Sequence, residues 1–163
     1  MKILAAIDNS SMSQPVFEQA LSLAKKNQAN LMLLHVLSSE DEESPLTVPT
    51  QVDEIAWARG SEIDLERWRE QWKKYESECL EKLQARAAEA QKVDMNVEVQ
   101  QVAGSPGRTI CQLAQTWGAD LIVIGNRSHS KMSELVLGSV SNYVLHHAPC
   151  SVVTVKVPVK TKT

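Results

Sequence analysis

The sequence predicts an α/β fold, a doubly wound parallel sheet of five strands with helices on both faces. Three observations indicate this. Short apolar runs alternate along the chain with segments whose apolar residues recur at helical spacing. The run at 30–37 is apolar on both faces, as strands are when helices cover both sides of a parallel sheet. Polar residues follow two of the runs at their carboxyl ends, where ligands bind in this architecture.

The first part of the chain supplies two strands and a helix. Residues 2–8 form a short apolar run that ends in the carboxylate of Asp8. Serines then offer N-cap oxygens and Pro15 suits a first helical turn. Apolar residues follow at helical spacing, and 30–37 is the second strand. The capping serines are Ser10, Ser11 and Ser13, and the helical face is Phe17, Ala20, Leu21 and Ala24.

The second part of the chain repeats the alternation. Residues 96–102 alternate like a strand near a sheet edge. Ser105 caps the next helix, and Gly118 ends it. Residues 120–125 read as a buried strand and 150–157 as the last one. The helix between Ser105 and Gly118 carries one apolar face, formed by Ile110, Leu113, Ala114 and Trp117.

Composition limits the function classes. The 163 residues are 43% hydrophobic, which suits one domain over 1–163. The net charge of −3 argues against nucleic acid and anionic membrane surfaces as partners. No apolar run approaches the ~20 residues of a membrane span, and the N-terminal run is too short for a signal peptide. Three scattered cysteines without metal-ligand spacing fit a reducing compartment, so we expect a cytoplasmic protein.

One segment, at about 38–75, departs from the compact alternation. Residues 38–61 read as a long polar connection, in which the acidic run 40–43 is expected to be solvated. A helix is predicted over 61–92, with an apolar stripe at alternating spacings of three and four. The favoured interpretation is that this helix packs on the sheet. The alternative is that its Trp-rich first half extends beyond the sheet and contacts a partner. The stripe consists of Leu65, Trp68, Trp72, Tyr75, Cys79 and Leu83.

The segment 125–141, GNRSHSKMSELVLGSVS, is dense in small hydrogen-bonding residues. It places Gly138 and Ser139 at the start of a helix, where free N–H groups and partial positive charge suit an anion. Neither the G-x-x-x-x-G-K-[ST] loop of NTPases nor a G-x-G-x-x-G after the first strand is present. From the residues alone, a phosphate cradle and a well-capped surface loop are about equally supported.

Several stretches of the sequence resemble a known family, the UspA-like universal stress proteins. The resemblance lies in KILAAIDNSSMS, LLHVL and the stretch from Val102 to Val155, and covers nearly the whole chain outside 38–75. The family's nucleotide motif is G-x-x-G, nine residues, then G-[ST]. Here the spacing from Gly125 to Gly138 is kept, and Ser128 replaces the second glycine. If that position has positive φ, the serine costs about 1 kcal/mol; otherwise it adds a donor, and we expect binding to survive.

The resemblance implies a Rossmann-like fold of the adenine nucleotide alpha hydrolase type, with strand order 3-2-1-4-5, and a site for ATP, or AMP or ADP, with Mg²⁺. Asp8 would face the ribose or a phosphate-bound Mg²⁺, and backbone groups of Val36 would read the adenine edge. The implied nucleotide-binding residues are Ala6, Ile7, Asp8, Val36, Ile124, Gly125, Asn126, Arg127, Ser128, His129, Gly138, Ser139, Val140 and Ser141.

No catalytic residue is predicted. His35 on a buried strand is interpreted as a core or dimer-facing histidine, and no histidine is placed to form a triad with Asp8 and a serine. The leading hypothesis is a non-catalytic ATP-binding stress or signalling module. Two alternatives stay open, a weak ATPase and a protein-interaction scaffold that has lost nucleotide binding.

The last strand, Cys150–Val157, is expected at a sheet edge, and its apolar character makes an open edge costly. The resemblance implies that two such edges pair antiparallel in a homodimer. Proline at Val153 or Val155 is then predicted to remove a ladder donor and give monomers. The alternative is a monomer whose edge is protected by Lys156 and the tail that follows it.

Overall fold

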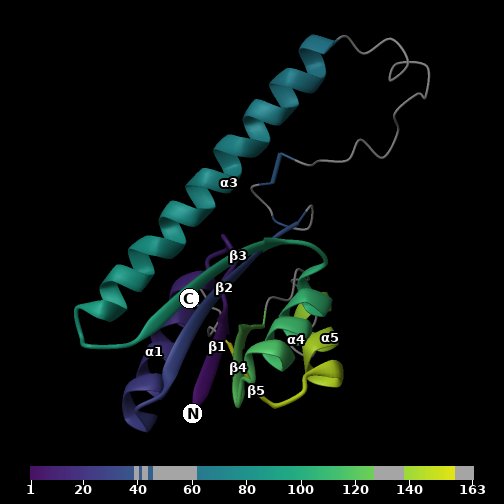
Figure 1. The fold of residues 1–163 in the computed structure, drawn as a ribbon. Helices are drawn as coiled ribbons and strands as arrows, with labels where there is room; N and C mark the ends of the chain where they lie inside the picture. Colours follow the sequence, from purple (N-terminus) through teal and green to yellow (C-terminus); the bar gives the residue numbers. More distant parts are fainter. Residues whose placement is uncertain (39–40, 42–43, 46–61, 127–137, 157–163) are drawn as a thin grey trace, which may run out of the picture.

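A five-stranded parallel sheet lies at the centre of the protein, with strands in the order β3-β2-β1-β4-β5 (Figure 1). The computed structural model describes residues 1–38, 41, 44–45, 62–126 and 138–156, with the backbone alone at 62–65. Both the predicted fold class and the predicted strand order are confirmed. The strands are β1 (Lys2–Ala6), β2 (Asn30–Leu37), β3 (Val97–Ala103), β4 (Leu121–Gly125) and β5 (Ser151–Val155).

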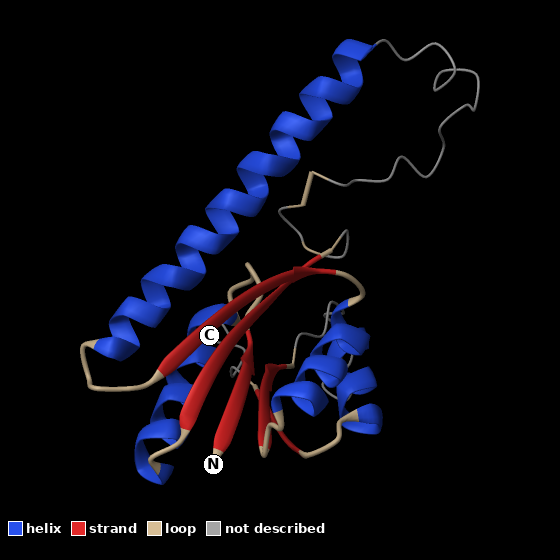
Figure 2. Cartoon of the chain, viewed as in Figure 1, coloured by secondary structure: helices blue, strands red, loops and turns tan. Residues whose placement is uncertain are grey.

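Helices cover both faces of the sheet (Figure 2). Two apolar cores result, because successive side chains of a strand point to opposite faces. Along β1, Ile3 and Ala5 belong to one core and Leu4 to the other. The first core lies under α1 (Ser13–Asn27) and α3 (Glu62–Gln91), and the second under α4 (Pro106–Trp117) and α5 (Ser139–His147).

The serines before α1 do not cap it as predicted. Met12 is the N-cap residue and no side-chain oxygen caps the helix. The Ser10 hydroxyl instead accepts the Met12 N–H at 3.1 Å and donates to Asp8 Oδ1 at 2.6 Å. Ser105 occupies the N-cap position of α4, also without a side-chain hydrogen bond. The predicted stop at Gly118 is confirmed, since its φ of 73° is in the left-handed region.

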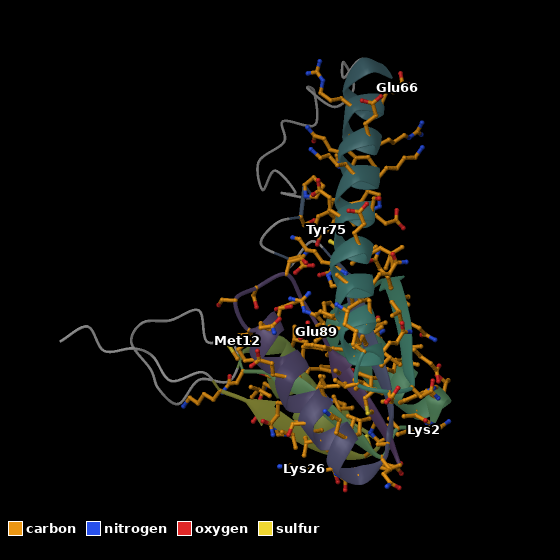
Figure 3. The ribbon with its side chains drawn as sticks, turned by 90° about the vertical axis from the view of Figure 1, so that its left-hand side faces the viewer. Lys2, Met12, Lys26, Glu66, Tyr75 and Glu89 are labelled. Carbon is orange, nitrogen blue, oxygen red and sulfur yellow. The ribbon has the colours of Figure 1, made fainter. Side chains whose placement is uncertain are left out.

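Helix α3 is 30 residues long, and Tyr75 and Cys79 pack against Leu37 near the end of β2. Leu83 is in the first core, whereas Trp68, two residues after the first described side chain of the helix, is 41% exposed. Figure 3 shows Glu66 far from the sheet and Glu89 beside it. The favoured packing is therefore found from about Tyr75 onward, and the helix before Trp72 does extend beyond the sheet; a partner for that part stays a prediction. No helix in the described part of the chain is long and apolar enough to span a membrane.

The contact between α4 and α5 depends on a glycine. A Cβ added to Gly107 would lie 2.7 Å from Cδ1 of Tyr143 and 2.9 Å from its Cγ, and a rigid ring cannot yield as a flexible side chain can. We expect Gly107→Ala to lower the free energy of unfolding by about 1–3 kcal/mol through overpacking, despite the better helix propensity of alanine. Denaturant unfolding measures this.

The matched control is Gln115→Ala, a change to alanine at an exposed position of the same helix. It should stay within about 0.5 kcal/mol of the unmodified protein. A Gly107→Ala variant as stable as this control would mean that Tyr143 moves aside without cost.

Candidate functional site

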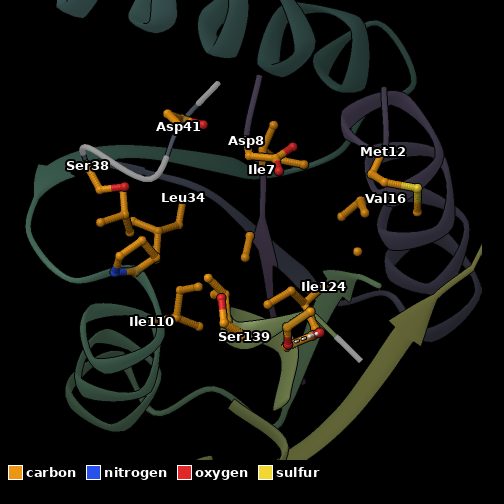
Figure 4. A pocket seen from close by; sticks show the side chains of 17 residues that line it. Ile7, Asp8, Met12, Val16, Leu34, Ser38, Asp41, Ile110, Ile124 and Ser139 are labelled. Atoms are coloured by element: carbon orange, nitrogen blue, oxygen red, sulfur yellow. Dashed lines mark hydrogen bonds between the residues drawn. The ribbon is translucent and has the colours of Figure 1, made fainter. Parts of the chain in front are cut away.

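A cavity of about 370 Å³ opens at the carboxyl ends of β1, β2 and β4, and the first turns of α1, α4 and α5 complete its walls (Figure 4). Its size falls in the range of small-molecule sites. The sequence-predicted residues that line it are Ala6, Ile7, Asp8, Val36, Ile124, Gly125, Gly138, Ser139, Val140 and Ser141. The lining residues that were not predicted are Met12, Val16, Leu34, Ser38, Asp41, Pro106 and Ile110.

The other predicted residues do not line the cavity or lie outside the described part of the chain. Asn126 does not line it, but its Oδ1 accepts the N–H of Gly138 at 3.4 Å, which joins the end of β4 to the start of α5. Arg127, Ser128 and His129 lie outside the described residues. Some of the unpredicted residues had a signal in the pattern, because Leu34 shares a face of its strand with Val36, and Ile110 lies on the apolar face of its helix.

Strand β2 extends past the end of β1 and leaves part of its edge facing the cavity. The last residue pair of the two strands is Ala6 with Leu34, and Leu34 C=O accepts the Ile7 N–H at 2.8 Å. Backbone groups alternate sides along a strand, so the N–H and C=O of Val36 point the same way as those of Leu34. Val36 thus offers one donor and one acceptor beyond the end of β1, at the position where the family resemblance places the contacts to adenine.

The start of α5 forms the opposite wall. Gly138 at the N-cap has no side chain to cap this helix, Asn126 accepts only the N–H of Gly138 itself, and the first turn holds no acidic residue. The first N–H groups of an α-helix have no acceptor within the helix, and they carry partial positive charge. Ser139 is exposed at this position, but the hydroxyl of Ser141 is buried and donates to Gly138 C=O at 3.0 Å. Ser141 is therefore engaged with the backbone instead of offering its hydrogen to the cavity.

Two carboxylates are among the described residues that line the cavity. Oδ1 of Asp8 accepts the N–H of Ser10 at 3.1 Å as well as its hydroxyl, which fixes the side chain beside the end of β1. Asp41 carries the second carboxylate. No lysine or arginine is among the described lining residues. Within this part of the lining, positive potential therefore comes from the N-terminus of α5.

The expectation that the acidic run 40–43 is solvated is wrong for Asp41. Its side chain is 7% exposed, and Oδ2 lies 2.9 Å from His35 Nε2 and 2.5 Å from the Tyr75 hydroxyl that donates to it. His35 is a buried core histidine, as interpreted from the sequence. Burial and the adjacent Asp41 raise the pKa of the Tyr75 phenol, so this group stays protonated and remains a donor.

The cysteines behave as small buried residues. Cys79 is buried in α3, where its Sγ accepts the Asn9 amide N–H at 2.9 Å, and Cys111 and Cys150 are partly buried. Burial raises the pKa of all three thiols, which keeps them protonated and weakly nucleophilic. The described residues contain no group of three or more side chains able to hold a metal ion.

Comparison with known proteins identifies relatives over most of the chain. The sequence model of the Universal stress protein family matches residues 1–156. Universal stress protein Slr1101 of Synechocystis sp. is 44% identical over 107 residues, which cover 66% of this chain and 99% of that protein. Universal stress protein Sll1388 of the same organism is 35% identical over 155 residues, covering 95% of this chain and 97% of its own.

Solved structures share the fold at lower identity. Universal stress protein UspA from Lactobacillus plantarum has a TM-score of 0.63 at 24% identity, with 96% of this chain and 97% of that chain covered. A universal stress protein in complex with cAMP has a TM-score of 0.59 at 18% identity, with 95% of each chain covered. The universal stress protein from Archaeoglobus fulgidus in complex with dAMP has a TM-score of 0.57 at 19% identity, with 96% of this chain and 98% of that chain covered. By its sequence match and its sheet, the chain belongs to the universal stress protein family.

Proposed function

We propose that this protein binds ATP with Mg²⁺ in the cavity at the ends of β1, β2 and β4, and acts as a dimeric stress-response or signalling module. The observation that carries the proposal is the pairing, in one cavity, of an open strand edge at Val36 with the helix N-terminus that begins at Gly138. The first suits a base edge and the second suits phosphates. Two proteins of the same fold are described as complexes with cAMP and dAMP, which supports an adenine nucleotide.

Each part of the cavity wall suits a different part of the nucleotide. Apolar side chains of the second core, among them Ile110 and Ile124, offer surfaces for the adenine ring. Asp8 lies beside the end of β1, where it would accept hydrogen bonds from the ribose hydroxyls. The N–H groups at the start of α5 would bind the phosphates, together with the predicted loop residues Arg127, Ser128 and His129.

Mg²⁺ would be bound chiefly through the phosphates. The described part of the chain brings no three metal-ligating side chains together, and the family resemblance implies that Asp8 faces either the ribose or the phosphate-bound ion. Mg²⁺ commonly binds with one or two carboxylates plus substrate phosphates and retains several waters, which this arrangement allows.

The lining residues favour binding over catalysis. Among those described, no serine lies in a hydrogen bond to a histidine, and His35, which contacts the lining residue Asp41, is buried. A serine nucleophile that is activated by a histidine needs such a hydrogen bond. We therefore propose a nucleotide-binding module without efficient hydrolysis.

The homodimer is proposed through β5. This strand pairs with β4 on one side and ends the sheet on the other, and its residues from Val152 to Val155 are partly buried. An apolar edge of this kind favours pairing with another strand. Antiparallel pairing of two β5 strands would continue the sheet from one protomer into its partner.

The direct test of nucleotide binding is to extract the purified protein with acid and identify any nucleotide released, then to measure ATP binding by calorimetry with and without Mg²⁺. We expect adenine nucleotide to co-purify, or ATP to bind the nucleotide-free protein. A folded protein that does neither is the scaffold that has lost nucleotide binding.

We also expect ATP to bind at least about tenfold more tightly than GTP. The N–H and C=O of Val36 match the acceptor and donor on the adenine edge, whereas guanine reverses both and would leave buried groups unpaired. Calorimetric titration with each nucleotide at the same Mg²⁺ concentration measures the ratio. Equal affinities would mean that the protein reads the phosphates alone.

A further inference from the structure

Asp41 is a buried carboxylate in the wall of the cavity. It lies in the connection that follows β2, it is 7% exposed, and it lines the cavity near Ser38 (Figure 4). Burying an ionised carboxylate is costly unless hydrogen bonds or a ligand compensate for the lost water. A neutral asparagine could accept from the same two donors without burying a charge, so the negative charge is what distinguishes aspartate at this position.

Two donors hold the carboxylate from different elements. The Tyr75 hydroxyl on α3 donates to Oδ2, and Nε2 of His35 on β2 lies 2.9 Å from the same oxygen. His35 Nδ1 is buried and has no hydrogen-bond partner among the described residues. A buried ring nitrogen without a proton is less costly to leave unpaired than a buried N–H group. The ring proton therefore belongs on Nε2, which donates to Asp41. His35 and Tyr75 are thus positioning residues that fix the orientation of the carboxylate.

The two ends of the cavity differ in charge. Figure 4 shows Asp41 and Ser38 at one end and Ser139 at the other. The start of α5 attracts anions and the Asp41 carboxylate repels them, so phosphates are favoured at the α5 end. The other end then receives the base, at the edge of β2 formed by Val36. An ionised carboxylate only accepts hydrogen bonds, so it attracts an amino group and repels a carbonyl oxygen.

We propose that Asp41 is a specificity-determining residue, which selects a purine with an amino group at position 6 over one with an oxygen there. The inference rests on the proposed nucleotide site and extends it. The carboxylate adds a charged acceptor to the neutral acceptor of Val36, and hydrogen bonds to charged groups are about twice as strong as neutral ones.

The test compares ATP with inosine triphosphate, in which an oxygen replaces that amino group, by calorimetry on the full chain. Asp41→Asn keeps the size of the side chain and an acceptor for Tyr75. It should lower the ratio of ATP affinity to inosine triphosphate affinity by about tenfold or more, because the amide can donate to the oxygen. Glu78→Gln is the matched control: it makes the same carboxylate-to-amide change at a side chain that is 54% exposed and outside the cavity lining, so the ratio should change by less than about threefold.

Thermal unfolding of each variant confirms that a folded protein is titrated, and Asp41→Ala replaces Asp41→Asn if the latter does not fold. ATP binding by the unmodified protein with the same ratio in the Asp41 variants would overturn this inference alone and leave Asp41 as an anchor for α3. Binding of neither nucleotide by the unmodified protein would overturn the proposed function, and this inference with it.

Discussion

A Gly138→Val variant is expected to lose ATP binding, with a dissociation constant at least about a hundredfold higher than that of the unmodified protein. Gly138 precedes α5 with φ −59° and ψ 153°, a conformation that valine also adopts, so the helix should form unchanged. The branched side chain would stand beside the first-turn N–H groups, where the phosphates are proposed to bind, and would block their close approach. Calorimetry with Mg²⁺ and ATP measures the loss.

The control for this variant is Leu145→Val, which also introduces valine into α5 but at a side chain that is 41% exposed and outside the cavity lining. Its ATP affinity should match that of the unmodified protein. The unfolding temperatures of both variants, measured without nucleotide, show whether the fold is kept. Unchanged ATP affinity in a folded Gly138→Val protein would mean that the phosphates do not bind at the start of α5.

The lining of the cavity was largely predictable because it depends on strand ends. Apolar runs define the strands, and parallel strands of one sheet bring their carboxyl ends to the same edge. Val36, Ile124 and Asp8 therefore lie together although the chain separates them widely. The spacing of the family motif added Gly138, at the start of α5, to the predicted site. From the residues alone, this segment could be either a surface loop or a phosphate cradle.

Asp41 was not predictable, because its burial depends on residues that its local sequence does not reveal. It stands in an acidic run typical of solvated loops, yet Tyr75, 34 residues further along the chain, donates to its carboxylate. Ser10 was misassigned for a related reason. A serine before a helix fits an N-cap, but here Asp8 accepts its hydroxyl and the helix begins without a side-chain cap.

For the edge strand β5, the face of the sheet on which each side chain lies was predictable, but the direction of each backbone N–H was not. Val153 and Val155 pack in the first core and Val152 in the second, as alternation predicts. The N–H directions depend on the register with β4. Val155 C=O accepts the Asn126 N–H at 2.8 Å, so the backbone groups of Val153 and Val155 face β4. Proline at either position would break the sheet itself, which corrects the variants that the sequence suggested.

A Thr154→Pro variant is therefore expected to be a folded monomer, while the unmodified protein is a dimer. Backbone groups alternate along β5, so the Thr154 N–H points to the open edge, where the partner strand is proposed to pair. Proline removes that donor, its ring obstructs the approach of a second strand, and the hydrogen bonds to β4 are kept. Light scattering at micromolar concentration should give the mass of one 18.1 kDa chain for the variant and twice that for the unmodified protein.

Two further variants isolate the cause of this change. Thr154→Ala alters the same side chain but keeps the N–H, so it should remain a dimer. Val153→Pro removes an N–H that faces β4, so it should lower the unfolding temperature of the protomer. A folded Thr154→Pro protein that is still dimeric would place the interface elsewhere than β5. A monomeric mass for the unmodified protein would contradict the dimer itself, since Lys156 and the residues after it would then suffice to protect the edge.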